Sequence, residues 1–390
     1  MPKGRTRAPK PDGRCTVGSQ QEPVGQHRIS GEAVTDSWPC NSPDTTREGR
    51  GHPPLRGNYL PESRELPPQR VFLGSWPTPL EPAPRLAEAL GLLPDDLWIK
   101  RDDLTGLGGG GNKVRKLEWT IGHAIAQGAD TLVTTGAPQS NHARLTAAAA
   151  ARLNMDAVLI FPGERKLLHS GNVVLNGLFG ARVAWAGKEA PDGLGKTAES
   201  VMSALRGEGR HPFLIPFGGS NAAGATGYKV CGDELRRQVP DLHTLVVALG
   251  SGGTMAGLVA CLGAAKVLGI DTGAMEAPLA AVSVMASEAG QVNIRTDQLR
   301  ARFDMVGESY SDLPESTIDA IYLTARTEGI VLDPVYTGRA MGGLVASVRD
   351  GQIQPGKKTV FLHTGGLPGL FGHRPMINDA ESGLVNFQWQ

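Results

Sequence analysis

Short apolar runs alternate with helical patterns along most of the chain after residue 68. The runs that we expect to form strands are Leu97–Lys100, Thr131–Thr135, Ala157–Phe161, Arg182–Trp185, Phe213–Pro216, Thr244–Leu249, Ala280–Val284 and Thr359–His363. Amphipathic helices are predicted at His142–Leu153, Tyr228–Val239 and Thr254–Leu268. Because strands and helices alternate, the pattern predicts an α/β fold with mostly parallel sheets covered by helices.

The two ends of the chain lack this pattern. Residues 1–68 contain 11 of the 28 prolines and show no sustained periodicity. Such a segment buries too little apolar surface to offset its ordering entropy, so we expect a disordered tail there. The pattern also fades from about His373, and we expect a C-terminal tail over residues 376–390.

Composition argues against several classes of protein. Lysine plus arginine equals aspartate plus glutamate at 39 each among 390 residues, which disfavours a nucleic-acid or membrane partner. The cysteines are scattered without a Cys-x-x-Cys pair, so we expect no disulfide framework, no metal site and a cytoplasmic location. No apolar run approaches the roughly 18 residues that span a bilayer, and no signal peptide is recognisable.

One lysine stands where a glycine-rich stretch becomes a helix. Residues 108–116 read Gly-Gly-Gly-Gly-Asn-Lys-Val-Arg-Lys, which places Lys113 at the predicted helix start. The positive end of the helix dipole lowers the pKa of an ammonium there, as a Schiff-base lysine requires. The alternative is a solvated basic edge formed by Lys113, Arg115 and Lys116.

The familiar phosphate motifs are weak or absent in this stretch. Gly106 to Gly111 matches G-x-G-x-x-G, but a run this rich in glycine matches easily. A Walker A loop requires lysine directly after its second glycine, whereas Asn112 intervenes here. A second loop, Gly250-Ser-Gly-Gly-Thr254, follows a predicted strand and could cradle an anion at a helix N-terminus or form a tight turn with a threonine cap.

Three further loops carry polar groups after predicted strands or near a turn. They are Gln139-Ser-Asn-His142, Asp333-Pro-Val-Tyr336-Thr337-Gly338 and His363-Thr364-Gly365-Gly366. Ser140 and Asn141 are residue types that often cap helices, so either could be structural. The carboxyl ends of parallel strands are where open α/β sheets bind ligands, so together these loops indicate a site.

Taken together, the loops resemble the pyridoxal-phosphate enzymes of the tryptophan-synthase-β type. The resemblance is to the family of D-cysteine desulfhydrase and 1-aminocyclopropane-1-carboxylate deaminase, and it runs from about Pro77 to Leu370. Its motifs are Gly-Gly-Asn-Lys-x-Arg-Lys-Leu-Glu (110–118), Gln-Ser-Asn-His and Asp-Pro-Val-Tyr, in this order. It implies two domains, a larger one that binds the cofactor (69–110 plus 222–375) and a smaller one (111–221), in a homodimer.

The resemblance also assigns roles to individual residues. Lys113 would hold pyridoxal phosphate as a Schiff base and move protons at the substrate Cα. Asn141 would bond the ring 3-oxygen, and Thr364 would meet the pyridine nitrogen. The phosphate would be cradled by Gly250, Ser251, Gly252, Gly253 and Thr254. The substrate, a small amino acid, would meet Ser140, Asn141, His142, Tyr336 and Thr337, with Ser140 and Tyr336 catalytic.

These roles favour one reaction over others. A hydroxyl such as that of Thr364 does not hold the pyridine nitrogen protonated, so the ring is a weaker electron sink and β-elimination is favoured over transamination. The deaminases carry Glu where this chain has Thr337. We therefore expect a lyase that converts D-cysteine to pyruvate, hydrogen sulfide and ammonia. The alternatives are 1-aminocyclopropane-1-carboxylate deamination and lysis of D-cysteate or another sulfur amino acid.

Two other classes of function compete with this interpretation. The first is a dinucleotide-dependent oxidoreductase, which the glycine run alone supports. Asp130 has nearly the spacing that a ribose-binding acid needs, but it precedes its strand instead of ending it. The second is a non-catalytic ligand sensor, which is disfavoured because no polar group in the matched loops is lost.

Overall fold

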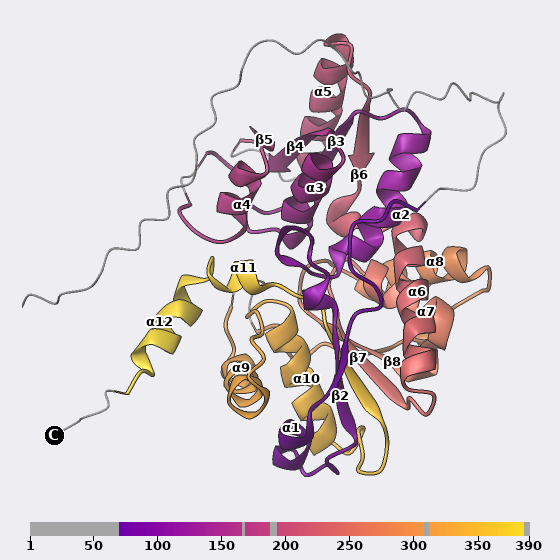
Figure 1. Cartoon of the computed structure of the whole chain (residues 1–390), viewed down its shortest axis with the longest axis vertical. Helices are drawn as coiled ribbons and strands as arrows, with labels where there is room; N and C mark the ends of the chain where they lie inside the picture. Colours follow the sequence, from indigo (N-terminus) through magenta and orange to yellow (C-terminus); the bar gives the residue numbers. More distant parts are fainter. Residues whose placement is uncertain (1–69, 166–167, 188–192, 308–309, 311, 386–390) are drawn as a thin grey trace, which may run out of the picture. The chain divides into compact units, whose positions relative to one another are not determined.

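The described residues contain two separate, mostly parallel sheets (Figure 1). The computed structural model describes residues 70–165, 168–187, 193–307, 310 and 312–385. The tail predicted over residues 1–68 and the end of the chain after residue 385 lie outside the described residues. The predicted α/β class is therefore confirmed for the part of the chain that is described.

The larger sheet has the strand order β1-β2-β10-β7-β8-β9. Its strands are β1 (Leu80–Pro82), β2 (Leu97–Arg101), β7 (Thr244–Leu249), β8 (Val267–Asp271), β9 (Arg300–Arg302) and β10 (Thr359–His363). Strand β1 is antiparallel to β2, and the other neighbours pair in parallel. The central strand β10 starts in register with both of its neighbours, since Thr359 pairs with Leu97 and with Thr244.

The smaller sheet is entirely parallel and has the order β5-β4-β3-β6. Its strands are β3 (Thr131–Thr135), β4 (Asp156–Phe161), β5 (Arg182–Trp185) and β6 (Pro212–Ile215). Crossover helices bury both faces of such a sheet. Ala143 of α3 (Asn141–Arg152) packs near Leu159, whereas Met202 of α5 (Gly193–Gly207) packs with Val158 on the other face.

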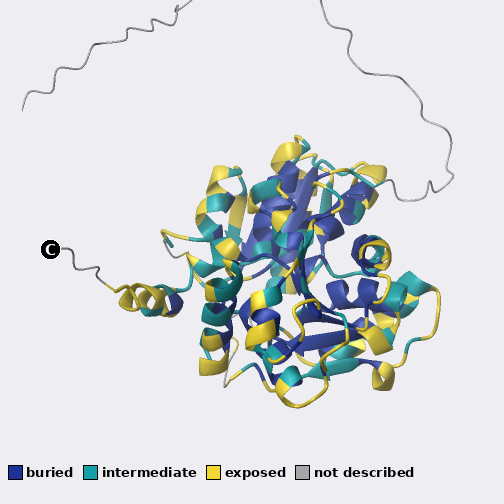
Figure 2. Cartoon of the chain, turned by 60° about the horizontal axis from the view of Figure 1, so that its bottom comes forward, coloured by how far each residue is buried: buried dark blue, intermediate teal, exposed yellow. Residues whose placement is uncertain are grey.

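The remaining helices connect the strands, and most of them pack against one of the two sheets. Their bounds are α1 (Pro84–Ala89), α2 (Lys113–Ala126), α4 (Asn172–Leu178), α6 (Ala222–Gln238), α7 (Gly253–Leu262), α8 (Pro278–Gly290), α9 (Glu315–Glu328), α10 (Thr337–Arg349), α11 (Leu367–Leu370) and α12 (Arg374–Ser382). Alternate residues of β7 face different cores, because Val246 packs with α10 and Val247 packs with α7. The inner strands β3, β4, β7, β8 and β10 are accordingly buried, whereas the edge strands β1, β5 and β9 are partly exposed (Figure 2).

Two of the expected elements are wrong. The apolar run Ala280–Val284 is part of helix α8, which Pro278 begins at its first turn. A short apolar run does not by itself separate a buried strand from a buried helix. The helix expected over Thr254–Leu268 ends at Leu262, and Gly263 with φ 88° separates it from strand β8. The C-terminal tail was expected over residues 376–390. Helix α12, which ends at Ser382, occupies the first part of that segment.

The two sheets use different parts of the chain. The strands of the larger sheet fall within residues 69–110 and 222–375, and those of the smaller sheet fall within 111–221. The two predicted domains and their boundaries stay a prediction. Among the described residues, no helix combines the length and the apolar character needed to cross a membrane.

Candidate active site

A pocket gathers most of the residues that the sequence singles out. It is lined by Asn112, Lys113, Lys116, Ser140, Asn141, His142, Phe217, Gly218, Ala248, Gly250, Ser251, Gly252, Thr254, Ala274, Tyr336, Thr364 and Gly365. The wall therefore draws on the carboxyl ends of β3, β7 and β10 and on the starts of α2, α3 and α7. Of the predicted site residues, Gly253 and Thr337 are not part of this wall.

Lys113 is the first residue of α2 and faces the pocket. Burial lowers the pKa of its amine to about 8, although a hydrogen bond with Lys116 acts in the opposite direction. At neutral pH roughly a tenth of such a lysine is uncharged, against well under a thousandth of an exposed lysine. Burial is thus the first cause of the lowered pKa, which is what a Schiff-base lysine requires.

The solvated basic edge considered for this stretch is not found. Arg115 and Lys116 are each only 1% exposed. The Lys116 amine donates to the Gly218 carbonyl oxygen at 2.9 Å and to Ser220 Oγ at 2.8 Å. Burial, followed by the charge of Lys113, holds the pKa of Lys116 well below its ordinary value. A bound anion would raise the pKa of Lys116 again, because it would stabilise the charged amine.

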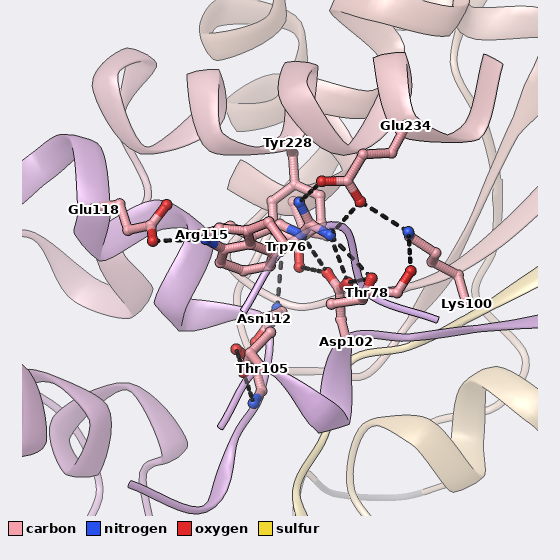
Figure 3. Close-up of polar contacts among 12 residues, drawn as sticks. Trp76, Thr78, Lys100, Asp102, Thr105, Asn112, Arg115, Glu118, Tyr228 and Glu234 are labelled. Atoms are coloured by element: carbon pink, nitrogen blue, oxygen red, sulfur yellow. Dashed lines mark hydrogen bonds and ion pairs between the residues drawn. The ribbon is translucent and has the colours of Figure 1, made fainter. Parts of the chain in front are cut away.

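Arg115 lies in a buried ionic network behind the pocket (Figure 3). Its guanidinium bonds both oxygens of Asp102, at 2.8 and 2.9 Å, and both oxygens of Glu234, each at 2.8 Å. Lys100 reaches Glu234 at 2.8 Å, and the Tyr228 hydroxyl donates to Asp102 at 2.7 Å. The network ties α2, which carries Lys113, to β2 and to α6.

The loop Gly250–Thr254 has the geometry of an anion cradle. It joins β7 to α7, and Gly252 takes φ 84° as the residue that precedes the helix. The threonine cap considered for this loop is not found, because Thr254 lies inside α7 and accepts a hydrogen bond from Asn112 Nδ2 at 3.0 Å. A Cβ on Gly253 would come within 2.9 Å of the Lys116 amine, so that amine lies beside the helix N-terminus. Backbone N–H groups and a cation thus converge.

The start of α3 places three consecutive side chains at the pocket. Ser140 is the N-cap, and its hydroxyl oxygen accepts the Ala143 N–H at 3.2 Å, which leaves its own proton available for a ligand. His142 is buried and bonds Thr134 through Nε2 at 3.0 Å, while its Nδ1 has no partner in the described part of the chain. Burial, followed by the charges of Lys113 and Lys116, holds the pKa of His142 well below its ordinary value.

Tyr336 lines the same pocket and is the residue that precedes α10. Its hydroxyl lies 2.6 Å from that of Tyr310. Burial, followed by the neighbouring Tyr310, raises its pKa well above the ordinary value, so the phenol stays protonated. The Asp333 carboxylate fixes the turn by accepting the N–H groups of Val335 and Tyr336 at 3.0 and 2.9 Å.

The prediction that Thr337 contacts the substrate requires correction. Thr337 is fully buried, and its hydroxyl donates to Asp333 Oδ1 at 2.7 Å and accepts the Asp333 N–H at 2.8 Å. Both hydrogen bonds hold the side chain in the turn and away from the pocket wall. Thr364, in contrast, follows β10 and lines the pocket as expected.

Sequence reasoning missed three residues of the site. Lys116 follows Lys113 by one helical turn, so the i, i+3 spacing could have placed both on one face of α2. Asn112 adjoins Lys113, but its bond to Thr254 joins residues far apart in the sequence. Tyr310 carries no local pattern, and only the folded chain brings it to Tyr336. Among the described residues, no group of three or more His, Cys, Asp or Glu could hold a metal ion.

The groups around Lys113 fit pyridoxal phosphate. A poised amine would bind its aldehyde, the N-terminus of α7 with Lys116 would bind its phosphate, and Asn141 and Thr364 lie on the same wall for its ring. The fold and the site thus define a pyridoxal-phosphate enzyme. Residues 71–365 match the family described as "Pyridoxal-phosphate dependent enzyme", and the chain belongs to this family.

Individual relatives show which pyridoxal-phosphate enzymes this chain resembles in sequence over most of its length. The chain is 40% identical over 316 residues to a "Putative 1-aminocyclopropane-1-carboxylate deaminase" of Pyrococcus abyssi, which covers 77% of this chain and 93% of the relative. It is 37% identical over 336 residues to a "D-cysteine desulfhydrase" of Klebsiella pneumoniae, covering 80% and 97%. The protein is therefore a pyridoxal-phosphate-dependent enzyme of the lyase family to which these relatives belong.

Solved structures agree with this assignment. A crystal structure of a 1-aminocyclopropane-1-carboxylate deaminase homologue matches with a TM-score of 0.72 at 37% identity, over 80% of this chain and 96% of that one. Threonine deaminase isoform 2 of Solanum lycopersicum matches with a TM-score of 0.52 at 20% identity, over 74% and 79%, and so shares the fold.

Proposed function

We propose that this protein is a β-elimination lyase for a D-amino acid, with D-cysteine as the leading substrate. The observation that carries the proposal is that one pocket is lined both by a lysine of lowered pKa, Lys113, and by Tyr336, whose raised pKa keeps it protonated. One group can accept a proton and the other can donate one, which an elimination requires. The products would be pyruvate, ammonia and hydrogen sulfide.

The residues that would hold the cofactor are those of the wall around Lys113. Lys116 and the loop Gly250–Thr254 would bind the phosphate, Asn141 the 3-oxygen and Thr364 the pyridine nitrogen. When bound, pyridoxal phosphate supplies an electron sink that makes the substrate Cα proton acidic. The hydroxyl of Thr364 leaves that sink moderate, which favours loss of a β-substituent.

The side chains around the substrate then divide the remaining work. The amine of Lys113, once released from the cofactor, would take the Cα proton. Ser140 would donate its hydroxyl proton to the substrate carboxylate, because its oxygen already accepts the Ala143 N–H. Tyr336 would protonate the departing sulfur, and Tyr310, 2.6 Å away, would hold that phenol in place.

The choice of D-cysteine rests on the residue after Tyr336. Thr337 is neutral and bonded to Asp333, so it supplies no carboxylate at this position. The resemblance places a glutamate there in the cyclopropane deaminases. The second candidate, 1-aminocyclopropane-1-carboxylate deamination, is retained because the relative at 40% identity bears that name.

A product assay separates these substrates. Purified protein loaded with pyridoxal phosphate is incubated with D-cysteine, L-cysteine, D-serine, β-chloro-D-alanine, D-cysteate and the cyclopropane amino acid. Sulfide and pyruvate from D-cysteine but not from L-cysteine support the proposal, whereas 2-oxobutanoate from the cyclopropane substrate supports the second candidate. Lys113→Ala should abolish either reaction. Tight binding of NAD without uptake of pyridoxal phosphate would revive the oxidoreductase alternative.

We further infer a homodimer in the cytoplasm. The dimer follows from the family resemblance, and the cytoplasmic location from the scattered cysteines, of which Cys231 and Cys261 are free thiols in the described part of the chain. Light scattering on the purified protein tests the first inference. A mass of one chain, 41.1 kDa, would contradict it.

A further inference from the structure

The side-chain amide of Asn141 is held in one orientation. Its Oδ1 accepts Asn172 Nδ2 at 3.0 Å and Arg144 Nη2 at 3.4 Å. An amide whose oxygen faces two donors must direct its NH2 group elsewhere, and Asn141 lines the pocket. The pocket therefore receives the donor end of this amide.

Asn172 is fixed as firmly as Asn141. It is fully buried, and its Nδ2 also donates to the Gln139 carbonyl oxygen at 2.8 Å. Its Oδ1 accepts Arg144 Nε at 3.0 Å. Since a guanidinium only donates, Asn172 must turn its oxygen toward Arg144 and its NH2 toward Asn141.

Arg144 determines how both asparagine amides are oriented. It is fully buried on α3, and its Nη1 donates to the carbonyl oxygens of Gly108 and Gly110, the latter at 3.0 Å. Burial lowers its pKa to about 10, so the side chain remains a cation at neutral pH. The same guanidinium thus holds the glycine run before Lys113 and orients the amide of Asn141.

We propose that Arg144 and Asn172 are positioning residues that lock the Asn141 amide with its NH2 toward the 3-oxygen of pyridoxal phosphate. The proposal rests on the proposed function, in which Asn141 bonds that oxygen. The direction of donation passes from Arg144 through Asn172 to Asn141 and then to the cofactor. A reversed Asn141 would present its own oxygen to the cofactor oxygen, and two acceptors repel each other.

Asn172→Asp is the most informative variant. The new carboxylate should keep the pairing with Arg144, but it accepts where Asn172 donated to the Gln139 carbonyl oxygen and to Asn141, and it should reverse the Asn141 amide. The dissociation constant of pyridoxal phosphate should rise roughly 10- to 100-fold, as expected for a lost hydrogen bond to a charged group. The midpoint of any pH-dependent change in the bound cofactor's visible absorbance should move to higher pH, because a donor to the ring oxygen favours its deprotonated form.

A double-mutant cycle with Asn141→Ala makes the test specific. Without Asn141, Asn172→Asp should weaken cofactor binding no further, because the amide through which it acts is gone. Asn172→Ala serves as a second variant and should cause a smaller loss, since it frees the amide without repelling it. Asn176→Ala is the matched control. Asn176 is buried on α4, the helix that also carries Asn172, and its amide has no hydrogen-bond partner in the described part of the chain.

The outcomes separate this inference from the proposed function. A wild-type protein that binds no pyridoxal phosphate, or an Asn141→Ala variant that binds it normally, overturns the proposed role of Asn141. If both behave as proposed and Asn172→Asp binds like the wild type, the positioning role is wrong. Additive losses in the double variant would contradict it as well. The thermal midpoint of each cofactor-free variant shows whether it has folded.

Discussion

Two lysines one helical turn apart on α2 share a pocket, and their burial changes their chemistry. Burial lowers the pKa of Lys113 to about 8, and burial followed by the charge of Lys113 holds the pKa of Lys116 well below its ordinary value. The division of roles between them follows from position. Lys116 bonds the Gly218–Ser220 turn beside the phosphate cradle, and Lys113 stands at the start of the helix.

The lowered pKa of Lys113 predicts the pH dependence of its reactivity. The neutral amine attacks aldehydes, so the rate at which cofactor-free protein forms a reducible adduct with pyridoxal at Lys113 should rise with pH and level off above about pH 8. The measurement is quantitative peptide mapping after borohydride reduction. The internal control is Lys357, whose side chain is exposed to solvent. A Lys113 profile that follows Lys357 would contradict the account.

Tyr336 is predicted to act as a proton donor. Tyr336→Phe should lower kcat with D-cysteine by about 100- to 10,000-fold, the usual effect of losing a general acid. Cofactor binding should change little, because the phenol is proposed to face the substrate. Tyr322→Phe is the matched control, since Tyr322 bonds Asp379 and is not among the residues of the pocket wall. An unchanged kcat in Tyr336→Phe would remove Tyr336 from the mechanism.

At the scale of elements, the glycine run before α2 is a packed loop. Gly108 to Gly111 all have positive φ, and a Cβ on Gly110 would overlap the Asp103 carbonyl group. Arg144 also binds the carbonyl oxygens of Gly108 and Gly110, so the loop is held where the chain turns into the helix that carries Lys113.

Gly110→Ala should therefore weaken the binding of pyridoxal phosphate and also lower the free energy of unfolding. Gly91→Ala is the matched control, because Gly91 has φ 76° against 71° for Gly110 but has open space around it. Positive φ alone costs an alanine about 1–2 kcal/mol, so Gly91→Ala should lose about that much unfolding free energy and bind pyridoxal phosphate normally. Gly110→Ala should lose more and bind the cofactor weakly. Equal effects of the two substitutions would show that the packing around Gly110 is unimportant.

The sequence predicted the elements and the site unequally. Parallel strands and glycine-rich loops have local signatures, so β7, α7 and the cradle between them were predictable. Strand β8 was not, because its interior residue Gly269 is a poor strand former that is needed where Met255 packs closely. The burial of Arg115 could not be foreseen either, since its partners Asp102 and Glu234 lie elsewhere in the sequence.

At the scale of the whole described chain, the pocket depends on both sheets. Ser140 and Asn141 follow a strand of the smaller sheet, whereas Gly250, Tyr336 and Thr364 belong to segments of the larger one. Helix α2 contributes Lys113 between them. The ionic network of Figure 3 fixes that helix to β2 and α6, so stability and site geometry are linked through Arg115.

Arg115→Met should accordingly be strongly destabilising. Removing one partner leaves two carboxylates buried, which costs about 3–5 kcal/mol of unfolding free energy. Arg152→Met, on the exposed end of α3, should change it by no more than about 0.5 kcal/mol. Denaturant unfolding of both variants provides the measurement. A loss below about 1 kcal/mol in Arg115→Met would contradict the importance of the network.

The same network predicts how stability depends on pH. Burial opposes ionisation of Asp102 and Glu234, but Arg115 more than offsets it and holds the pKa of each carboxyl below its ordinary value. Their contribution is thus fully present above the ordinary carboxyl pKa and is lost as the pH falls through the folded values. Acid should unfold the wild type, and Asp102→Asn should flatten this dependence. Unfolding free energies measured across the acidic range test this, and an unchanged slope in Asp102→Asn would contradict it.

The central claim is that Lys113 is the residue that binds pyridoxal phosphate covalently. The direct measurement is borohydride reduction of the loaded protein, followed by digestion and mass spectrometry of the labelled peptide. We predict one pyridoxyl-phosphate group on Lys113 and loss of the visible absorbance upon reduction. A label on Lys116 instead, or a protein that takes up no label, would contradict the account.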